Sequence, residues 1–129
     1  MLFRSLCLSV VLISSLFIHH GARAEVASGK EIIAVIGTGR MGAAAGPRLA
    51  AVGHTVIYGT RDPSSEKMRE LLGRSPGAKA VSQRQAVQSA DLVLLAIPWF
   101  ATEEFVASSG PWSGKLIMDM VNASKMGDD

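Results

Sequence analysis

Glu31-Ile-Ile-Ala-Val-Ile-Gly-Thr-Gly-Arg-Met-Gly42 is the stretch that decides the fold. Its apolar run, Ile32–Ile36, is typical of a buried parallel strand and leads directly into a Gly-x-Gly-x-x-Gly pattern with helix-forming residues behind it. In this pattern Gly37 permits a sharp turn, Gly39 lets the backbone approach a pyrophosphate, and Gly42 lets the helix pack closely on the strand. The stretch therefore predicts a strand, a turn and a helix N-terminus that bind a dinucleotide.

The first 24 residues differ in composition from the rest of the chain. Arg4 precedes an apolar run from Leu6 to Ile18, and Ala22-Arg-Ala24 supplies a small-x-small cleavage site. The apolar run is shorter than the about 20 residues that a membrane-spanning helix needs. We therefore expect residues 1–24 to be a signal peptide that is removed on export to the periplasm or the medium, leaving no stable membrane span. An uncleaved anchor is the alternative.

Removal of this leader makes the chain electrically neutral. Arg4 and Arg23 both lie in the leader, and without them the 13 basic residues of the full chain fall to the number of acidic residues, 11. Because no cluster of Lys and Arg remains, binding to nucleic acid or to an anionic membrane surface has no support. The single cysteine, Cys7, is lost as well, so we expect no disulfide, no cysteine nucleophile and no thiolate metal site. No other metal site is expected.

After the glycine turn, helical and strand-like segments alternate. We expect helices over 40–52, from a Ser64 or Ser65 cap to 72, from a Ser82 cap to 90, and over 100–107, and strands over 55–58, 78–81, 91–97 and 115–121. This alternation predicts an α/β fold: a Rossmann-like, doubly wound parallel sheet in a single domain over residues 31–129, behind a linker at 25–30. The ligand crevice of such a sheet lies beyond the carboxyl ends of its strands.

The end of the second strand carries the signal for cofactor choice. In NAD-binding versions of this fold an acidic residue about 20 positions after the glycine turn bonds the ribose 2′-hydroxyl, whereas an arginine accommodates a 2′-phosphate. Thr60 and Arg61 stand at the strand end and suit a phosphate, which favours NADP over NAD. Asp62, one position later, is the acidic residue that would favour NAD, so NAD remains an alternative cofactor. Lys67 is expected to be a solvated helix charge, unless it reaches the 2′-phosphate.

No residue of the sequence stands out as catalytic. His54 is the only histidine after the leader, and we expect it to be a turn residue because it lies at the end of the sheet opposite the cofactor. Hydride transfer needs little acid–base chemistry from the protein, since the cofactor carries the reaction and the protein supplies orientation. A catalytic side chain is therefore not required for a dinucleotide-dependent oxidoreductase.

Several segments together resemble the NADP-binding domain of deazaflavin-dependent (F-420 type) NADP oxidoreductases. Pyrroline-5-carboxylate reductases have an N-terminal domain of the same type. The resemblance covers nearly the whole chain after the leader and rests on these segments: Ile36-Gly-Thr-Gly-Arg-Met-Gly42, Gly53-His-Thr-Val, Tyr58-Gly-Thr-Arg-Asp-Pro63, Ala90-Asp-Leu-Val-Leu-Leu-Ala-Ile-Pro-Trp99 and Gly114-Lys-Leu-Ile-Met-Asp-Met-Val-Asn122.

The resemblance implies a role for each part of the crevice. The pyrophosphate would lie on the glycine turn, the 2′-phosphate at the end of the second strand, and the nicotinamide between the ends of the fourth and fifth strands. In that order the residues are Gly37, Thr38, Gly39, Arg40, Met41 and Gly42, then Thr60 and Arg61, then Ile97, Pro98 and Asn122.

The resemblance also implies hydride transfer between NADP and a deazaflavin or another small acceptor. The chain stops shortly after the fifth strand, so we expect the family's C-terminal part, which would hold the hydride partner, to be missing. Two alternatives therefore stay open: a non-catalytic nucleotide-binding module, which could need a partner chain, and a truncated gene product. Assembly as a homo-oligomer is possible in each case.

Overall fold

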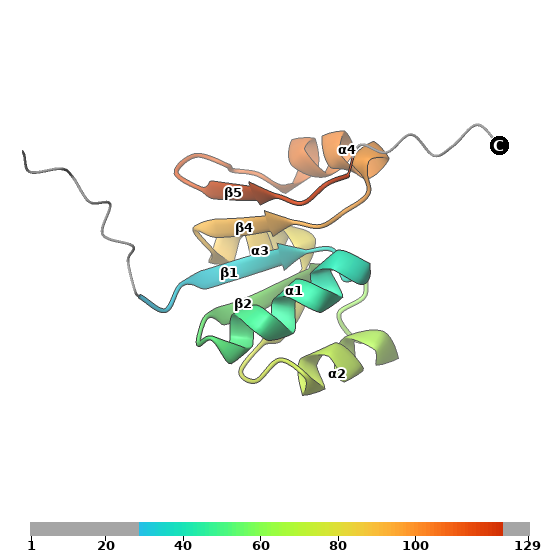
Figure 1. The fold of residues 1–129 in the computed structure, drawn as a ribbon. Helices are drawn as coiled ribbons and strands as arrows, with labels where there is room; N and C mark the ends of the chain where they lie inside the picture. Colours follow the sequence, from blue (N-terminus) through green and yellow to red (C-terminus); the bar gives the residue numbers. More distant parts are fainter. Residues whose placement is uncertain (1–28, 123–129) are drawn as a thin grey trace, which may run out of the picture.

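A five-stranded sheet organises the part of the chain that the computed structural model describes, residues 29–122 (Figure 1). The predicted leader, most of the predicted linker and residues 123–129 lie outside this range. Within it, no helix is long and apolar enough to cross a membrane. The elements are, in chain order, β1 (Ile32–Ile36), α1 (Arg40–Ala51), β2 (Thr55–Thr60), α2 (Glu66–Gly73), β3 (Lys79–Ser82), α3 (Gln83–Ser89), β4 (Leu92–Leu95), α4 (Trp99–Ser109) and β5 (Leu116–Asp119).

All neighbouring strands are parallel, in the order β3-β2-β1-β4-β5. Ile33 of β1 pairs with Val56 of β2 on one side and with Leu92 of β4 on the other. The chain therefore builds outward from β1 to β3 and then crosses back to the opposite side of β1. The order reverses between β1 and β4, and a crevice opens at such a point in doubly wound sheets. The predicted Rossmann-like α/β fold is confirmed.

Successive residues of the central strands point into two separate apolar layers. Ala34 and Ile36 of β1 pack with residues of α3 and α4, whereas Ile33 and Val35 pack with residues of α1 and α2. In Figure 1, α1 lies in front of the sheet and α3 behind it. This arrangement explains why the β1 sequence is apolar without alternation, because both of its faces are covered.

Two of the predicted helix starts are confirmed by their caps. The Ser65 hydroxyl accepts a hydrogen bond from the N–H of Met68 at 3.3 Å, at the start of α2. Ser82 forms a capping box with Gln85 at the start of α3. These bonds satisfy N–H groups that have no partner within the helix.

Strand ends differ from the predicted ones by up to two residues. β2 continues to Thr60, two residues beyond the predicted end, whereas β4 ends at Leu95. β4 is shorter than predicted, and Pro98, three residues after its end, is already the N-cap of α4. β5 is shorter than predicted at both ends, over Leu116–Asp119.

Helix α1 approaches β2 closely at Gly46. A side chain there would overlap the hydroxyl of Tyr58, which is fully buried. That hydroxyl lies 2.7 Å from the Ser75 hydroxyl, which itself donates to the carbonyl of Leu71 at 2.9 Å, so Tyr58 is the donor in the first bond. Burial raises the pKa of the Tyr58 hydroxyl and keeps it neutral. The pair ties the end of α2 to the sheet.

Candidate functional site

The glycine turn between β1 and α1 forms one wall of the site. Gly37 has φ +98°, a conformation that side chains rarely adopt, and its N–H donates to the carbonyl of Gly59 at 3.2 Å. A side chain on Gly42 would overlap the carbonyl oxygen of Gly37, so only glycine lets α1 pack this closely on the turn. The reasons expected for the first and third glycines therefore hold in the structure.

Gly39 differs from Gly37 and Gly42, because it faces open space. A side chain there would meet no atom within 4 Å. Gly39 is also the N-cap of α1, and no side chain caps this end of the helix. The first N–H groups of an α-helix have no partner within the helix and carry partial positive charge. The turn therefore combines open space with an uncapped helix N-terminus, a combination that suits an anion.

Arg61 and Asp62, just after the end of β2, have different surroundings. The Asp62 carboxylate accepts two hydrogen bonds from Ser64, from its N–H at 3.1 Å and its hydroxyl at 2.8 Å, and so closes a local turn. Arg61 instead lines the cavity beside the glycine turn, together with Thr60. Lys67 lines the same cavity, although the sequence favoured a solvated position for it. Of the two charged residues, Arg61 and not Asp62 therefore lines the cavity.

The ends of β4 and β5 form the opposite wall. The N–H of Ala96 donates to the carbonyl of Ile36 at 2.8 Å, which continues the pairing with β1 beyond the end of β4. Ile97 is buried, and Pro98 starts α4. Asn122 follows β5 and reaches the same cavity. Hydrophobic side chains therefore dominate this wall, and Asn122 adds a polar group.

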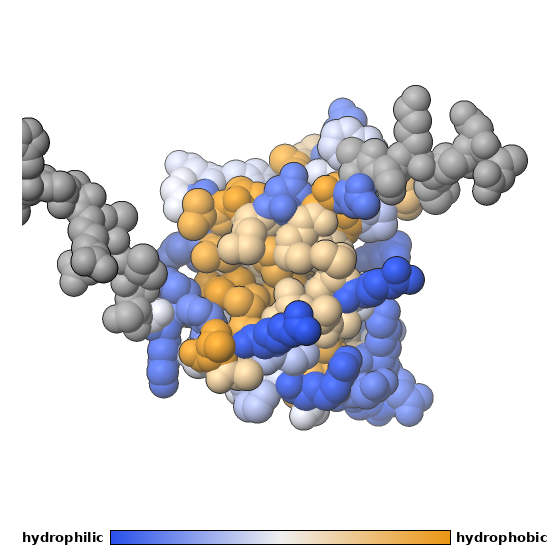
Figure 2. Space-filling model, viewed as in Figure 1, coloured by the Kyte–Doolittle hydropathy of each residue, from blue (hydrophilic) through white to orange (hydrophobic). Residues whose placement is uncertain are grey.

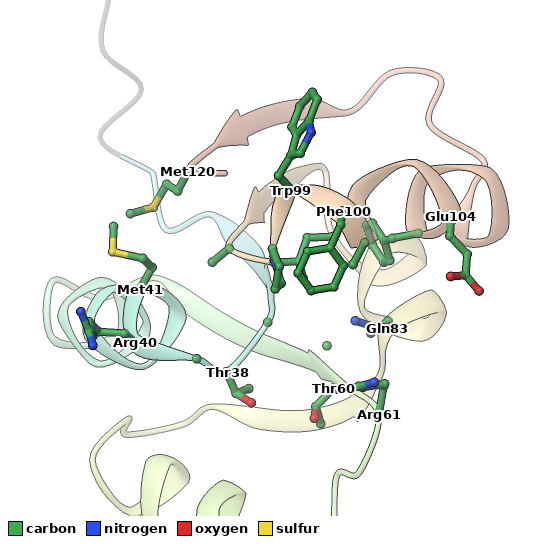
Figure 3. Close-up of a pocket in the computed structure, with 18 of the residues that line it drawn as sticks. Thr38, Arg40, Met41, Thr60, Arg61, Gln83, Trp99, Phe100, Glu104 and Met120 are labelled. Carbon is green, nitrogen blue, oxygen red and sulfur yellow. The ribbon is translucent and has the colours of Figure 1, made fainter. Parts of the chain in front are cut away.

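These walls line an open cavity of about 1210 Å³ at the carboxyl end of the sheet (Figure 3). In the view of Figure 3, Met41 and Met120 lie at one end, Thr60, Arg61 and Gln83 lie at the other, and Phe100 overhangs the middle. The predicted residues that line the cavity are Gly37, Thr38, Gly39, Arg40, Met41, Thr60, Arg61, Ile97, Pro98 and Asn122. Gly42, the remaining one, packs behind the turn.

Sequence reasoning did not single out several other lining residues. Gln83 begins α3 and Glu104 lies in α4, and both contribute side chains to the cavity. Met120 follows β5, and Phe100 belongs to the first turn of α4. Their positions in the sequence could have indicated them, because each of these residues lies shortly after the carboxyl end of a strand or in the helix that follows it.

His54 lies at the far end of the sheet, as predicted. Its Nδ1 accepts a hydrogen bond from the N–H of Glu31 at 3.2 Å, just before β1 begins. It does not line the cavity. In the described residues, no three His, Cys, Asp or Glu side chains lie together in a way that would hold a metal ion.

A family model described as "NADP oxidoreductase coenzyme F420-dependent" matches residues 32–123. The chain belongs to this family. The match covers every strand and helix of the sheet, so it includes all the cavity walls.

Solved structures with the same fold agree with this membership. A proposed F420-dependent NADP-reductase from Arthrobacter sp. FB24 is 29% identical, with a TM-score of 0.65. An imine reductase from Pseudomonas sp. is 26% identical, with a TM-score of 0.62. A reductive aminase from Aspergillus terreus, solved with NADPH and ethyl-5-oxohexanoate, is 23% identical, with a TM-score of 0.61, and shows the fold alone.

The aligned part is a large share of this chain and a smaller share of each of those proteins. It covers 73% of this chain and 46% of the Arthrobacter protein. The corresponding values are 72% and 33% for the imine reductase, and 74% and 33% for the reductive aminase. The chain thus spans less than half the length of these relatives.

Proposed function

We propose that this chain binds NADP(H) across the cavity and presents the nicotinamide for hydride transfer, as an NADP-dependent oxidoreductase of the deazaflavin-reductase type. One observation carries the proposal. Residues predicted from separate segments, the glycine turn, the end of β2 and the ends of β4 and β5, line a single cavity at the point where the strand order reverses. Dinucleotides bind at this position in doubly wound sheets.

The glycine turn fits a pyrophosphate. The space in front of Gly39 is the space that a side chain would fill, and it is open. The uncapped N-terminus of α1 offers N–H donors and a favourable dipole for two phosphates. The backbone alone can therefore hold the pyrophosphate there.

The polar end of the cavity fits a 2′-phosphate. Arg61 offers a planar guanidinium, Thr60 a hydroxyl and Lys67 a second positive charge, and all three line the cavity. Asp62, the residue that would favour NAD, has its carboxylate engaged with Ser64. The charge pattern therefore supports NADP over NAD.

The opposite end fits the nicotinamide and a flat hydride partner. Ile97 and Pro98 line this end of the cavity with apolar side chains, against which a nicotinamide ring can pack. Trp99 and Phe100 follow, and their side chains are 63% and 75% exposed. The bound nicotinamide supplies the hydride chemistry, and the chain supplies its orientation. Exposed aromatic surface beside that position suits stacking of a planar acceptor such as a deazaflavin.

Two measurements on the purified chain test this proposal. Fluorescence titration with NADPH and NADH should show tighter binding of NADPH. Mixing NADPH with an oxidised deazaflavin should then show loss of the deazaflavin absorbance as the hydride is transferred. Failure to bind either dinucleotide would remove the proposal. Binding without hydride transfer would favour the second candidate, a nucleotide-binding module that needs a partner chain for turnover.

A further inference from the structure

One part of the cavity lies beyond the positions proposed for the phosphates and the nicotinamide. The first residue of α3 and one face of α4 line it: Gln83, Ala101, Glu104, Phe105 and Ser108. In Figure 3, Gln83 and Glu104 lie on the same side of the cavity as Arg61. Figure 2 shows hydrophilic side chains over α2, which follows β2 on this side of the sheet, and apolar ones between β5 and α1. The occupant of this part should therefore offer hydrogen-bonding groups.

The start of α3 is held directly against the end of β2. A side chain on Gly59 would lie only 3.2 Å from the Cα of Gln83, so glycine permits this close approach. Thr60 of β2 pairs with Ser82, which caps α3. Gln83 therefore stands next to the strand end that carries Thr60 and Arg61.

Gln83 and Glu104 line the cavity with their hydrogen-bonding capacity unused. Within residues 29–122, no hydrogen bond or ion pair engages the Gln83 amide or the Glu104 carboxylate. The polar residues that follow Gln83 are engaged elsewhere, because Gln85 closes the capping box of α3 and Arg84 donates to the carbonyl of Ser108. The Arg84 bond also ties α3 to α4, the two helices that carry the unused groups.

We propose that this part of the cavity binds the adenine base and that Glu104 selects adenine over purines with a 6-oxo group. The inference rests on the proposed binding of NADP(H). The base is attached to the ribose carbon next to the one that carries the 2′-phosphate, so a 2′-phosphate at Arg61 places the base beside Gln83. The Glu104 carboxylate accepts from the 6-amino group, and the Gln83 amide donates to the neighbouring ring nitrogen. Ala101 and Phe105 add apolar surface for the flat faces of the base.

The charge of Glu104 makes its contact selective. A carboxylate only accepts hydrogen bonds. Adenine presents a 6-amino donor, whereas guanine presents a 6-oxo acceptor, as hypoxanthine does. A 6-oxo group facing Glu104 would leave two acceptors unpaired, and a site that is built around one hydrogen bond rejects the analogue that cannot form it. The Gln83 amide has both a donor and an acceptor, so it can bond to either base and adds affinity without selectivity.

Calorimetric titration of the purified chain with NADPH and with its hypoxanthine analogue, deamino-NADPH, tests this assignment. The wild-type chain should bind NADPH about tenfold to a hundredfold more tightly, the range expected for one hydrogen bond to a charged group. Glu104→Gln keeps the size of the side chain, but its amide can accept from an amino group or donate to an oxo group. The preference for NADPH should therefore fall about tenfold in this variant.

Glu103→Gln is the matched control. Glu103 precedes Glu104 in α4 and does not line the cavity, so this change removes the same charge from the same helix without touching the base. It should leave the preference for NADPH unchanged. Gln83→Ala should weaken the binding of both ligands by a similar factor, because its contact does not distinguish them. Circular dichroism of each variant checks that the domain is folded.

The outcomes separate this inference from the proposed function. If the wild-type chain binds NADPH and deamino-NADPH equally well, the role of Glu104 is wrong and the proposed NADPH binding stands. An unchanged preference in Glu104→Gln, or an equal loss of preference in Glu103→Gln, would also overturn the assignment. Binding of neither ligand would remove the proposed function and this inference with it.

Discussion

At the scale of single residues, we propose that the end of β2 decides the choice between NADP and NAD. Arg61 lines the cavity, whereas the Asp62 carboxylate is bonded to Ser64. Arg61→Ala should therefore lower NADPH affinity about tenfold to a hundredfold, the loss of one charge-assisted contact of roughly 1.5–3 kcal/mol, and leave NADH affinity nearly unchanged. Calorimetric titration of both cofactors measures this, with Asp62→Asn as the matched control. A wild-type chain that prefers NADH would contradict the assignment.

Substitutions of two glycines in the turn should distinguish an effect on NADPH binding from an effect on folding. Gly39→Val should abolish NADPH binding, because the new side chain fills the space proposed for the pyrophosphate, while the melting temperature changes little. Gly42→Ala should instead unfold the domain, because its methyl group overlaps the Gly37 carbonyl. Fluorescence titration and thermal melts report the two effects. Equal NADPH affinity in Gly39→Val and wild type would rule out the phosphate role.

At the scale of elements, the contact of α1 with β2 depends on Gly46. Gly46→Ala should lower the free energy of unfolding by about 1–3 kcal/mol, because the added methyl group overlaps the buried Tyr58 hydroxyl. Gly73→Ala at the end of α2 is the matched control, since a side chain there meets nothing within 4 Å, and it should leave stability unchanged or slightly raised. Urea denaturation compares the two. Equal stability of both variants would show that α1 can shift away from β2.

At the scale of the whole molecule, we propose that residues 1–24 direct export and are then removed. The mature chain should begin at Glu25, because Ala22-Arg-Ala24 is the small-x-small site that follows the apolar run. Intact-mass measurement of the exported protein checks this. Ala24→Leu should block processing and leave the leader attached. If the wild-type mass retains residues 1–24, the leader is an uncleaved anchor.

Sequence patterns alone were enough to predict the element order and most of the residues proposed to line the crevice. Local signals were enough for this: the apolar run before the glycine turn, the serine caps of α2 and α3, and the Thr60-Arg61 pair. Such signals depend on neighbours in the sequence, so they can be recognised without knowing which distant residues lie nearby. A parallel sheet then brings strand ends together at one edge, which is why predicted residues far apart in the sequence line one cavity.

The tertiary structure alone decided which side chains share an environment. The apolar pattern of β5 is the same whether its faces are covered or exposed, and the sheet order leaves it at the edge. Lys67, Gln83 and Glu104 line the same cavity as Arg61 only because of the way in which α2, α3 and α4 pack. The physical reason is that periodicity specifies which face of an element is apolar, whereas long-range packing specifies what that face meets.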